Sequence, residues 1–163
     1  MARSRAPGRA IGFTLVELVV TFTLLLILSL FAGPILSDFG FARIATAQVR
    51  VASAIRYAQE LSMTTHRVHG VSFDLPSNKF TVYENANPND PTRNPATSSD
   101  YVIPLGSGHM LGVTIQSASF GAQAKVEFGT DGSPVAGGSV VLAHSSAGTR
   151  TVAVSASTGL TTP

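Results

Sequence analysis

The most apolar stretch of the chain runs from Leu18 to Leu36, nineteen residues without a charged side chain. A helix rises about 1.5 Å per residue, so this run would be about 28 Å long. That length is close to the ~30 Å hydrocarbon core of a bilayer. Counting from Phe13 leaves room for the helix to tilt, and we therefore expect a transmembrane helix over residues 13–36.

After this run, the apolar pattern changes to the spacing of an amphipathic helix. Small and apolar residues recur at steps of three and four, which places them on one helical face. They are Ile44, Ala47, Val51, Ala54, Ala58 and Leu61. The charged residues Arg50 and Glu60 point in other directions. The pattern predicts a stalk helix over residues 37–67 whose apolar face packs on a folded domain.

From residue 68 onward the apolar residues alternate with polar ones, which is the period of β-strands. The stretches that show it are "GVSFDL", "KFTVYE", "GVTIQSASF", "KVEFG", "SVVLAH" and "TRTVAVSA". Residues 85–100 contain three prolines and four asparagines and predict a long loop. We expect a β head domain over residues 68–163, and an α+β fold: a long N-terminal transmembrane and stalk helix packed on an antiparallel β-sheet head.

The charge distribution gives the apolar run a direction. The net charge is +2, but Arg3, Arg5 and Arg9 precede the run and all nine acidic residues follow residue 12. Positive residues before a span favour a cytoplasmic amino terminus, so the remainder of the chain would be exported. The chain has no cysteine, which excludes disulfides and cysteine-ligated metal sites.

Three interpretations of the run compete at this point. A cleavable secretory signal would have a short apolar region followed by small residues at the cut, whereas here Ala32 and Gly33 adjoin Pro34. An ordinary single-span anchor fits the length but leaves Glu17 unexplained. A carboxylate at the start of such a span costs free energy and marks a functional candidate.

The third interpretation explains Glu17. The sequence Gly12-Phe13-Thr14-Leu15-Val16-Glu17 resembles the signature of the type IV prepilin superfamily. The resemblance implies a leader peptide, residues 1–12, that prepilin peptidase removes after Gly12, with N-methylation of Phe13. It also implies an assembly role for Glu17, which would neutralise the terminal amine of a neighbouring subunit. Pilin-like proteins often have a proline where Pro34 stands, and Gly33-Pro34 then implies a helix kink.

The head resembles one branch of that superfamily. "VEFGTDGSPV" and "RTVAVSASTG" are similar to the closing strands of the type II secretion minor pseudopilin H and of FimT-like minor pilins. This resemblance implies a minor pseudopilin subunit that assembles through its N-terminal helix, near the tip of a secretion pseudopilus. Its implied partners are prepilin peptidase, other major and minor pilins or pseudopilins, and inner-membrane lipid. The implied location is the bacterial inner membrane, single-pass, with a cytoplasmic N-terminus and a periplasmic head.

The alternative function is a FimT-like minor pilin of a type IV pilus that binds DNA for uptake. Residues 35–163 contain eight basic and eight acidic side chains, and residues 151–163 contain no lysine or arginine. A surface that follows phosphates needs concentrated positive charge, so nucleic acid is not the expected partner. His66 and His69 could face one helix turn, but no third ligand has a suitable spacing. We therefore expect no metal, no cofactor and no enzymatic activity.

Overall fold

Helix α1 (Leu15–Thr65) is the longest element of the chain. The computed structural model describes residues 13–162, apart from the side chains of residues 31–38. The chain divides into an N-terminal unit, residues 1–36, and a C-terminal unit, residues 37–163.

In the C-terminal unit, α1 buries the face that its sequence pattern predicts. Ile44, Val51 and Ala58 are among the side chains with no exposed surface, and Leu61 is half-buried. Ile55 is also fully buried, which widens the apolar stripe beyond the expected positions. The helix ends at Thr65, two residues before the expected residue 67, because His66 adopts a φ of 54° that no α-helix continues.

Eight strands follow α1 and form two sheets. Their bounds are β1 (His69–Asp74), β2 (Lys79–Glu84), β3 (Val102–Pro104), β4 (Val113–Phe120), β5 (Lys125–Phe128), β6 (Gly138–His144), β7 (Gly148–Val154) and β8 (Thr161–Thr162). One sheet has the order β3-β2-β1-β5 and the other β4-β6-β7-β8, with antiparallel pairing throughout both. A short 3₁₀ helix, η1 (Gly108–Met110), precedes β4. The α+β prediction is confirmed, with two sheets where the sequence analysis expected one.

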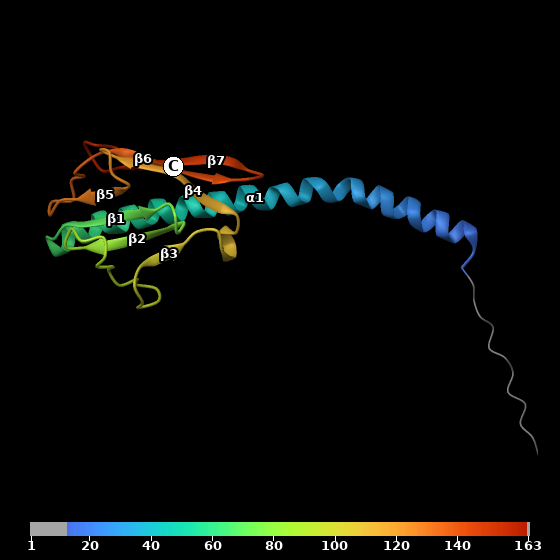
Figure 1. The fold of residues 1–163 in the computed structure, drawn as a ribbon, viewed down its shortest axis with the longest axis horizontal. Coiled ribbons are helices and arrows are strands. Elements are labelled where there is room, and N and C mark those ends of the chain that lie inside the picture. The colour runs from blue at the N-terminus through green and yellow to red at the C-terminus, as the bar shows by residue number, and fades with distance from the viewer. Residues whose placement is uncertain (1–12, 163) are drawn as a thin grey trace, which may run out of the picture. The chain divides into compact units, whose positions relative to one another are not determined.

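One hydrophobic core joins α1 to both sheets. Alternate residues of β5 and β6 point into it, which is the half-buried pattern that the sequence predicted. Phe73 of β1 and Phe120 of β4 stack with their ring centroids 5.8 Å apart, linking the two sheets directly. Figure 1 shows α1 of this unit running beside both sets of strands, β1–β2 and β6–β7. The head therefore has a continuous core of its own.

Polar side chains of α1 fix the helix against the second sheet. Gln48 donates to the carbonyl oxygen of Thr151 at 3.0 Å, and Arg150 donates to the side chain of Gln48 at 3.3 Å. Further along the helix, Arg56 donates from Nε to the hydroxyl of Thr161 in β8 at 2.6 Å. These bonds set the rotation of α1, which apolar packing alone specifies less sharply.

Two short strands and the long loop differ from the expectation. β3 contains three residues and ends in a proline, so the sequence shows no alternation there. β8 is an edge strand that pairs with β7, in a tail where no alternating stretch predicted a strand. The loop at residues 85–100 folds back on β2: Thr92 donates to the carbonyl oxygen of Val82, and Asn94 accepts from the backbone of Ala96.

Candidate assembly interface

The start of α1 is fixed by its own local sequence. The backbone N–H of Glu17 donates to Thr14 Oγ1 at 3.3 Å, and Leu18 makes the first helical bond to the Thr14 carbonyl oxygen at 3.2 Å. Thr14 is therefore the N-cap, and Thr14-Leu15-Val16-Glu17 has the form of a capping box. The spacing of threonine and glutamate signals this cap in the sequence, but the sequence analysis above did not identify it.

The cap explains the position of Glu17 in a second way, which does not depend on pairing with a terminal amine. A glutamate in the first turn lies near the positive end of the helix dipole, where a negative charge is favourable. A capping box accepts glutamine as well as glutamate, because either side chain can reach the N-cap N–H. Pairing with a terminal amine requires the negative charge. The two roles of Glu17 therefore differ in what Glu17→Gln would remove.

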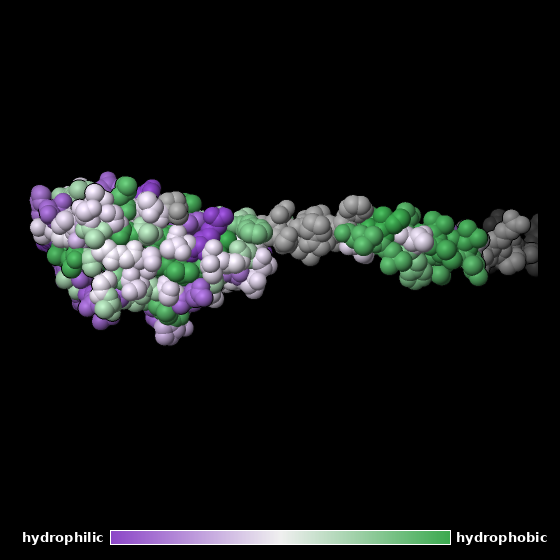
Figure 2. Space-filling view, turned by 90° about the horizontal axis from the view of Figure 1, so that it is seen from above, coloured by the Kyte–Doolittle hydropathy of each residue, from purple (hydrophilic) through white to green (hydrophobic). Residues whose placement is uncertain are grey.

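The large apolar side chains between Phe13 and Leu30 are exposed. Their exposed fractions run from 49% at Val20 to 80% at Leu15. Figure 2 shows this part of the chain as an almost continuous hydrophobic surface. Contiguous apolar surface on this scale marks contact with lipid or with other proteins. The N-terminal unit therefore presents an interface along the described part of its helix.

The hydroxyl side chains within this apolar stretch are satisfied locally. Thr21 donates to the carbonyl oxygen of Leu18, Thr23 to that of Val19 and Ser29 to that of Leu25, at 2.8–2.9 Å. Hydroxyls bonded to the preceding turn are tolerated in a helix that water does not reach. The polar residues of the stretch are thus compatible with an apolar environment.

Within the described residues, no helix is long and apolar enough to cross a membrane. Gly12 lies outside those residues, and the surroundings of Gly33 and Pro34 are not described, although both positions fall within the bounds of α1. Phe13 is described and is 79% exposed, directly before the N-cap. The predicted cleavage, methylation and kink therefore remain predictions.

The histidines do not form the pair that their spacing suggested. His69 is buried, with Nδ1 3.1 Å from the carbonyl oxygen of Arg67 and Nε2 3.9 Å from the carboxylate of Glu84. His66 is exposed in the turn after α1. His144 Nδ1 lies 3.1 Å from the hydroxyl of Ser146. Among the side chains that the structure describes, which leave out residues 31–38, no three histidine, aspartate or glutamate side chains are grouped as metal ligands would be.

A buried polar contact lies in the first sheet. Tyr83 is fully buried and donates from its hydroxyl to Glu127 at 2.9 Å, and Lys125 pairs with the same carboxylate oxygen at 2.9 Å. Tyr83 and Glu127 both lie opposite Gly70, where a Cβ would come within 2.6 Å of the tyrosine hydroxyl. Burial, followed by Glu127, raises the pKa of Tyr83 above its ordinary range. This contact holds three strands together.

Comparison with known proteins places the C-terminal unit in a family. The family model described as type II transport protein GspH matches residues 47–158. None of the curated proteins and none of the solved structures compared matches the chain. The matched residues exclude Gly12 to Glu17, so the head and the N-terminal signature are separate observations that lead to one superfamily. Because the match spans more than half of the chain, the protein belongs to the type II transport protein GspH family.

Proposed function

We propose that the protein is a minor pseudopilin that assembles through its N-terminal helix into a type II secretion pseudopilus, near the tip. The family assignment supports a type II secretion pseudopilin in general. The observation that carries the proposal further is the exposed apolar face between Phe13 and Leu30. A folded head that has its own core does not need this face, so it is available for lipid and for other subunits.

The proposal includes a single inner-membrane span over residues 13–36, with a cytoplasmic N-terminus and a periplasmic head. Membership of the GspH family implies a component of a periplasmic pseudopilus, which is consistent with this orientation. Three arginines before the span and nineteen uncharged residues from Leu18 to Leu36 support it. The hydroxyl bonds of Thr21, Thr23 and Ser29 remove the cost of burying those groups in lipid.

Processing at Gly12 would create the charge that Glu17 needs. Prepilin peptidase would remove residues 1–12 and methylate Phe13, leaving a terminal amine four residues from Glu17. In an assembly, Glu17 of one subunit would pair with the amine of its neighbour. Pairing offsets the desolvation that each charge would suffer alone in an apolar interface. It would also fix the axial position of each subunit.

The proposed role is structural, as is the role of the GspH family. The partners would be prepilin peptidase, the other major and minor pseudopilins and membrane lipid. DNA uptake by a FimT-like pilin is the rival function. The equal numbers of basic and acidic side chains in residues 35–163 give it less support. A salt-dependent gel shift with the full chain in detergent distinguishes the two, since only the rival predicts a complex that weakens steeply with salt.

The test of the proposal is incorporation into an assembly. The full chain would be expressed with the other subunits of its secretion system, and the periplasmic assembly purified through the major subunit. We expect the chain to co-purify, and Glu17→Ala to abolish its co-purification while the chain stays in the membrane. If Glu17→Ala incorporates as well as the unchanged chain, amine pairing is wrong. If the unchanged chain does not co-purify, the proposed function is wrong.

A further inference from the structure

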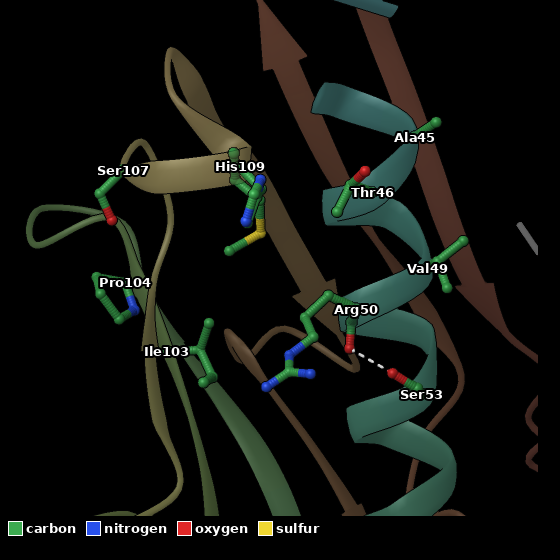
Figure 3. A pocket seen from close by; sticks show the side chains of 10 residues that line it. Ala45, Thr46, Val49, Arg50, Ser53, Ile103, Pro104, Ser107 and His109 are labelled. Carbon is green, nitrogen blue, oxygen red and sulfur yellow. Dashed lines mark hydrogen bonds between the residues drawn. The ribbon is translucent and has the colours of Figure 1, made fainter. Parts of the chain in front are cut away.

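A groove of about 830 Å³ lies between α1 and the segment that runs from β3 to η1. Figure 3 shows Arg50 reaching from the helix toward Ile103, and His109 pointing into the space between the helix and the strand. The lining residues come from α1 on one side (Ala45, Thr46, Val49, Arg50, Ser53) and from β3, η1 and the turn between them on the other (Ile103, Pro104, Ser107, His109, Met110). All of them belong to the C-terminal unit.

The groove continues along the helix toward Phe39. A second hollow shares Thr46 and His109 with the first and adds Phe39 and Arg43. Residues 39–53 span about 21 Å of helix at 1.5 Å per residue. The two adjoining hollows together therefore extend along about four turns of α1.

The groove presents exposed apolar side chains among polar ones, and two arginines lie along it. Phe39 is 56% and Val49 66% exposed, although both are large apolar side chains. Arg43 and Arg50 are seven residues apart, so they lie about two turns apart on one face of α1. None of the ion pairs found among the described side chains includes either arginine. The groove thus offers apolar contact together with two positive charges about 10.5 Å apart.

The strand that borders the groove favours docking through side chains rather than through the backbone. β3 is an edge strand, but it has only three residues and ends in Pro104, which has no N–H to donate. Short edges that end in proline resist the addition of another strand. An amphipathic helix that lays its apolar face in the groove is a common mode of recognition through side chains.

A second copy of this chain does not supply the matching helix. The acidic residues within α1 are Glu17, Asp38 and Glu60, and no two of them are seven residues apart. Two copies packed side by side would also bring their arginines together, which is unfavourable. We infer that the groove receives an amphipathic helix of a different subunit, whose apolar stripe carries two carboxylates seven residues apart. This inference rests on the proposed function, because it assumes a multi-subunit assembly.

Single-cysteine variants test the inference directly, because the chain has no cysteine of its own. Thr46→Cys and Ser107→Cys each place one thiol at an exposed position of the groove, and Thr130→Cys places one at an exposed turn elsewhere. Maleimide labelling of the full chain in membranes would be compared with and without the other subunits. We expect the two groove thiols to react roughly tenfold more slowly only when the other subunits are present, as for a groove that is mostly occupied. Thr130→Cys should react equally fast in both cases.

The charges are tested by reversal in the same assay. Arg43→Glu combined with Arg50→Glu should remove most of the protection at Thr46→Cys, because attraction to the two carboxylates becomes repulsion. The control is Arg67→Glu, which makes the same change at an exposed position beyond the end of α1. It should leave the protection intact. Resistance of the C-terminal unit to protease reports that each variant is folded.

Four results would overturn the inference. Protection in membranes that contain this chain alone would mean that a second copy fills the groove. Protection by a single-stranded oligonucleotide, without other subunits, would mean that the arginines bind phosphate. Groove thiols that stay reactive in chain co-purified with the assembly would refute the inference and leave the proposed function standing. A chain that never co-purifies would refute both.

Discussion

Ile55 and Ile27 belong to the same helix, α1, and have the same side chain, yet Ile55 is fully buried and Ile27 is 52% exposed. The two isoleucines differ in exposure because the two units differ in the apolar partners that they supply to α1. Around Ile55 the two sheets of the C-terminal unit supply apolar partners and hydrogen bonds. Around Ile27 the described residues supply none, although the helix itself is capped and internally bonded.

This contrast distinguishes a segment that is buried within its own chain from a segment whose described side chains stay exposed. The C-terminal unit is stabilised by burial against its own strands, so its stability is a property of one chain. The N-terminal unit is richer in apolar residues, yet its described side chains stay exposed, so burying them requires lipid or other subunits. Four predictions, from the largest expected effect to the smallest, test whether the two units differ in this way.

The first prediction uses one substitution at the two matched positions. Ile55→Ala should cost about 2–5 kcal/mol of unfolding free energy, because it leaves a cavity in a fully packed site. Ile27→Ala should leave that free energy unchanged within about 0.5 kcal/mol. The measurement is the urea concentration at which the C-terminal unit of the full chain becomes sensitive to protease. Equal losses at the two positions would contradict the division into a self-sufficient unit and a dependent one.

The second prediction concerns Tyr83, whose hydroxyl donates to Glu127 inside the C-terminal unit. Tyr83→Phe should cost about 1.5–3 kcal/mol at neutral pH, the usual range for a hydrogen bond to a charged group. Tyr57→Phe is the control, because Tyr57 stacks on Tyr101 through its ring and the variant keeps that contact. The same urea and protease measurement applies. A loss at Tyr57 as large as that at Tyr83 would show that the bond to Glu127 is not the cause.

The raised pKa of Tyr83 adds a pH dependence. The folded chain holds this proton more tightly than the unfolded chain, in which tyrosine titrates near pH 10. The corresponding stability is therefore fully present below about pH 10 and is lost as the pH rises further. Tyr83→Phe should flatten the alkaline decline. A decline of unchanged steepness in that variant would assign the effect to other groups.

The third prediction separates the two roles of Glu17. If the negative charge pairs with a terminal amine, Glu17→Gln should reduce incorporation into the assembly at least about tenfold, which corresponds to about 1.4 kcal/mol. If Glu17 acts only in the capping box, glutamine should serve and incorporation should be nearly normal. Incorporation is measured by co-purification with the major subunit. Thr14→Val, which removes the cap and keeps the charge, is the complementary variant and should have the smaller effect.

The smallest expected effect is at a turn of the C-terminal unit. Ser133 donates to Asp131 from both its hydroxyl, at 2.6 Å, and its backbone, at 3.0 Å, and these bonds lower the pKa of Asp131. Ser133→Ala should raise that pKa toward its ordinary value, while the backbone bond retains part of the shift. Titration followed by NMR measures the change. An unaltered pKa would assign the shift to other causes.

Strand positions were predictable because the alternation of apolar and polar residues shows which side chains of a strand are buried. The sequence indicated β1, β2 and β4–β7 from that pattern alone. It did not indicate how the strands divide into two sheets, because alternation specifies a face and not a neighbour. β3 escaped prediction because three residues ending in Pro104 are too short to alternate. The contact of Tyr83 with Glu127, 44 residues away, depends on Gly70 lying between them.

The N-terminal motif can be read directly from the sequence, whereas the surfaces of the head cannot. Phe13 and Glu17 stand out in a short motif, and the cap at Thr14 was present in the same six residues. The groove is different, because it is formed by α1 and by η1, which begins more than fifty residues after the last lining residue of the helix. Only the fold brings Arg50 and Ile103 to opposite sides of one space. Sequence patterns predict local features and leave such surfaces undetermined.

The central claim is that the N-terminal unit is processed for assembly, and the intact mass of the chain tests it most directly. The protein would be extracted from membranes of cells with and without a prepilin peptidase. The account predicts loss of residues 1–12 and the addition of one methyl group, and only when the peptidase is present. An identical full-length mass in both samples would contradict it, since Glu17 would then have no terminal amine to pair with.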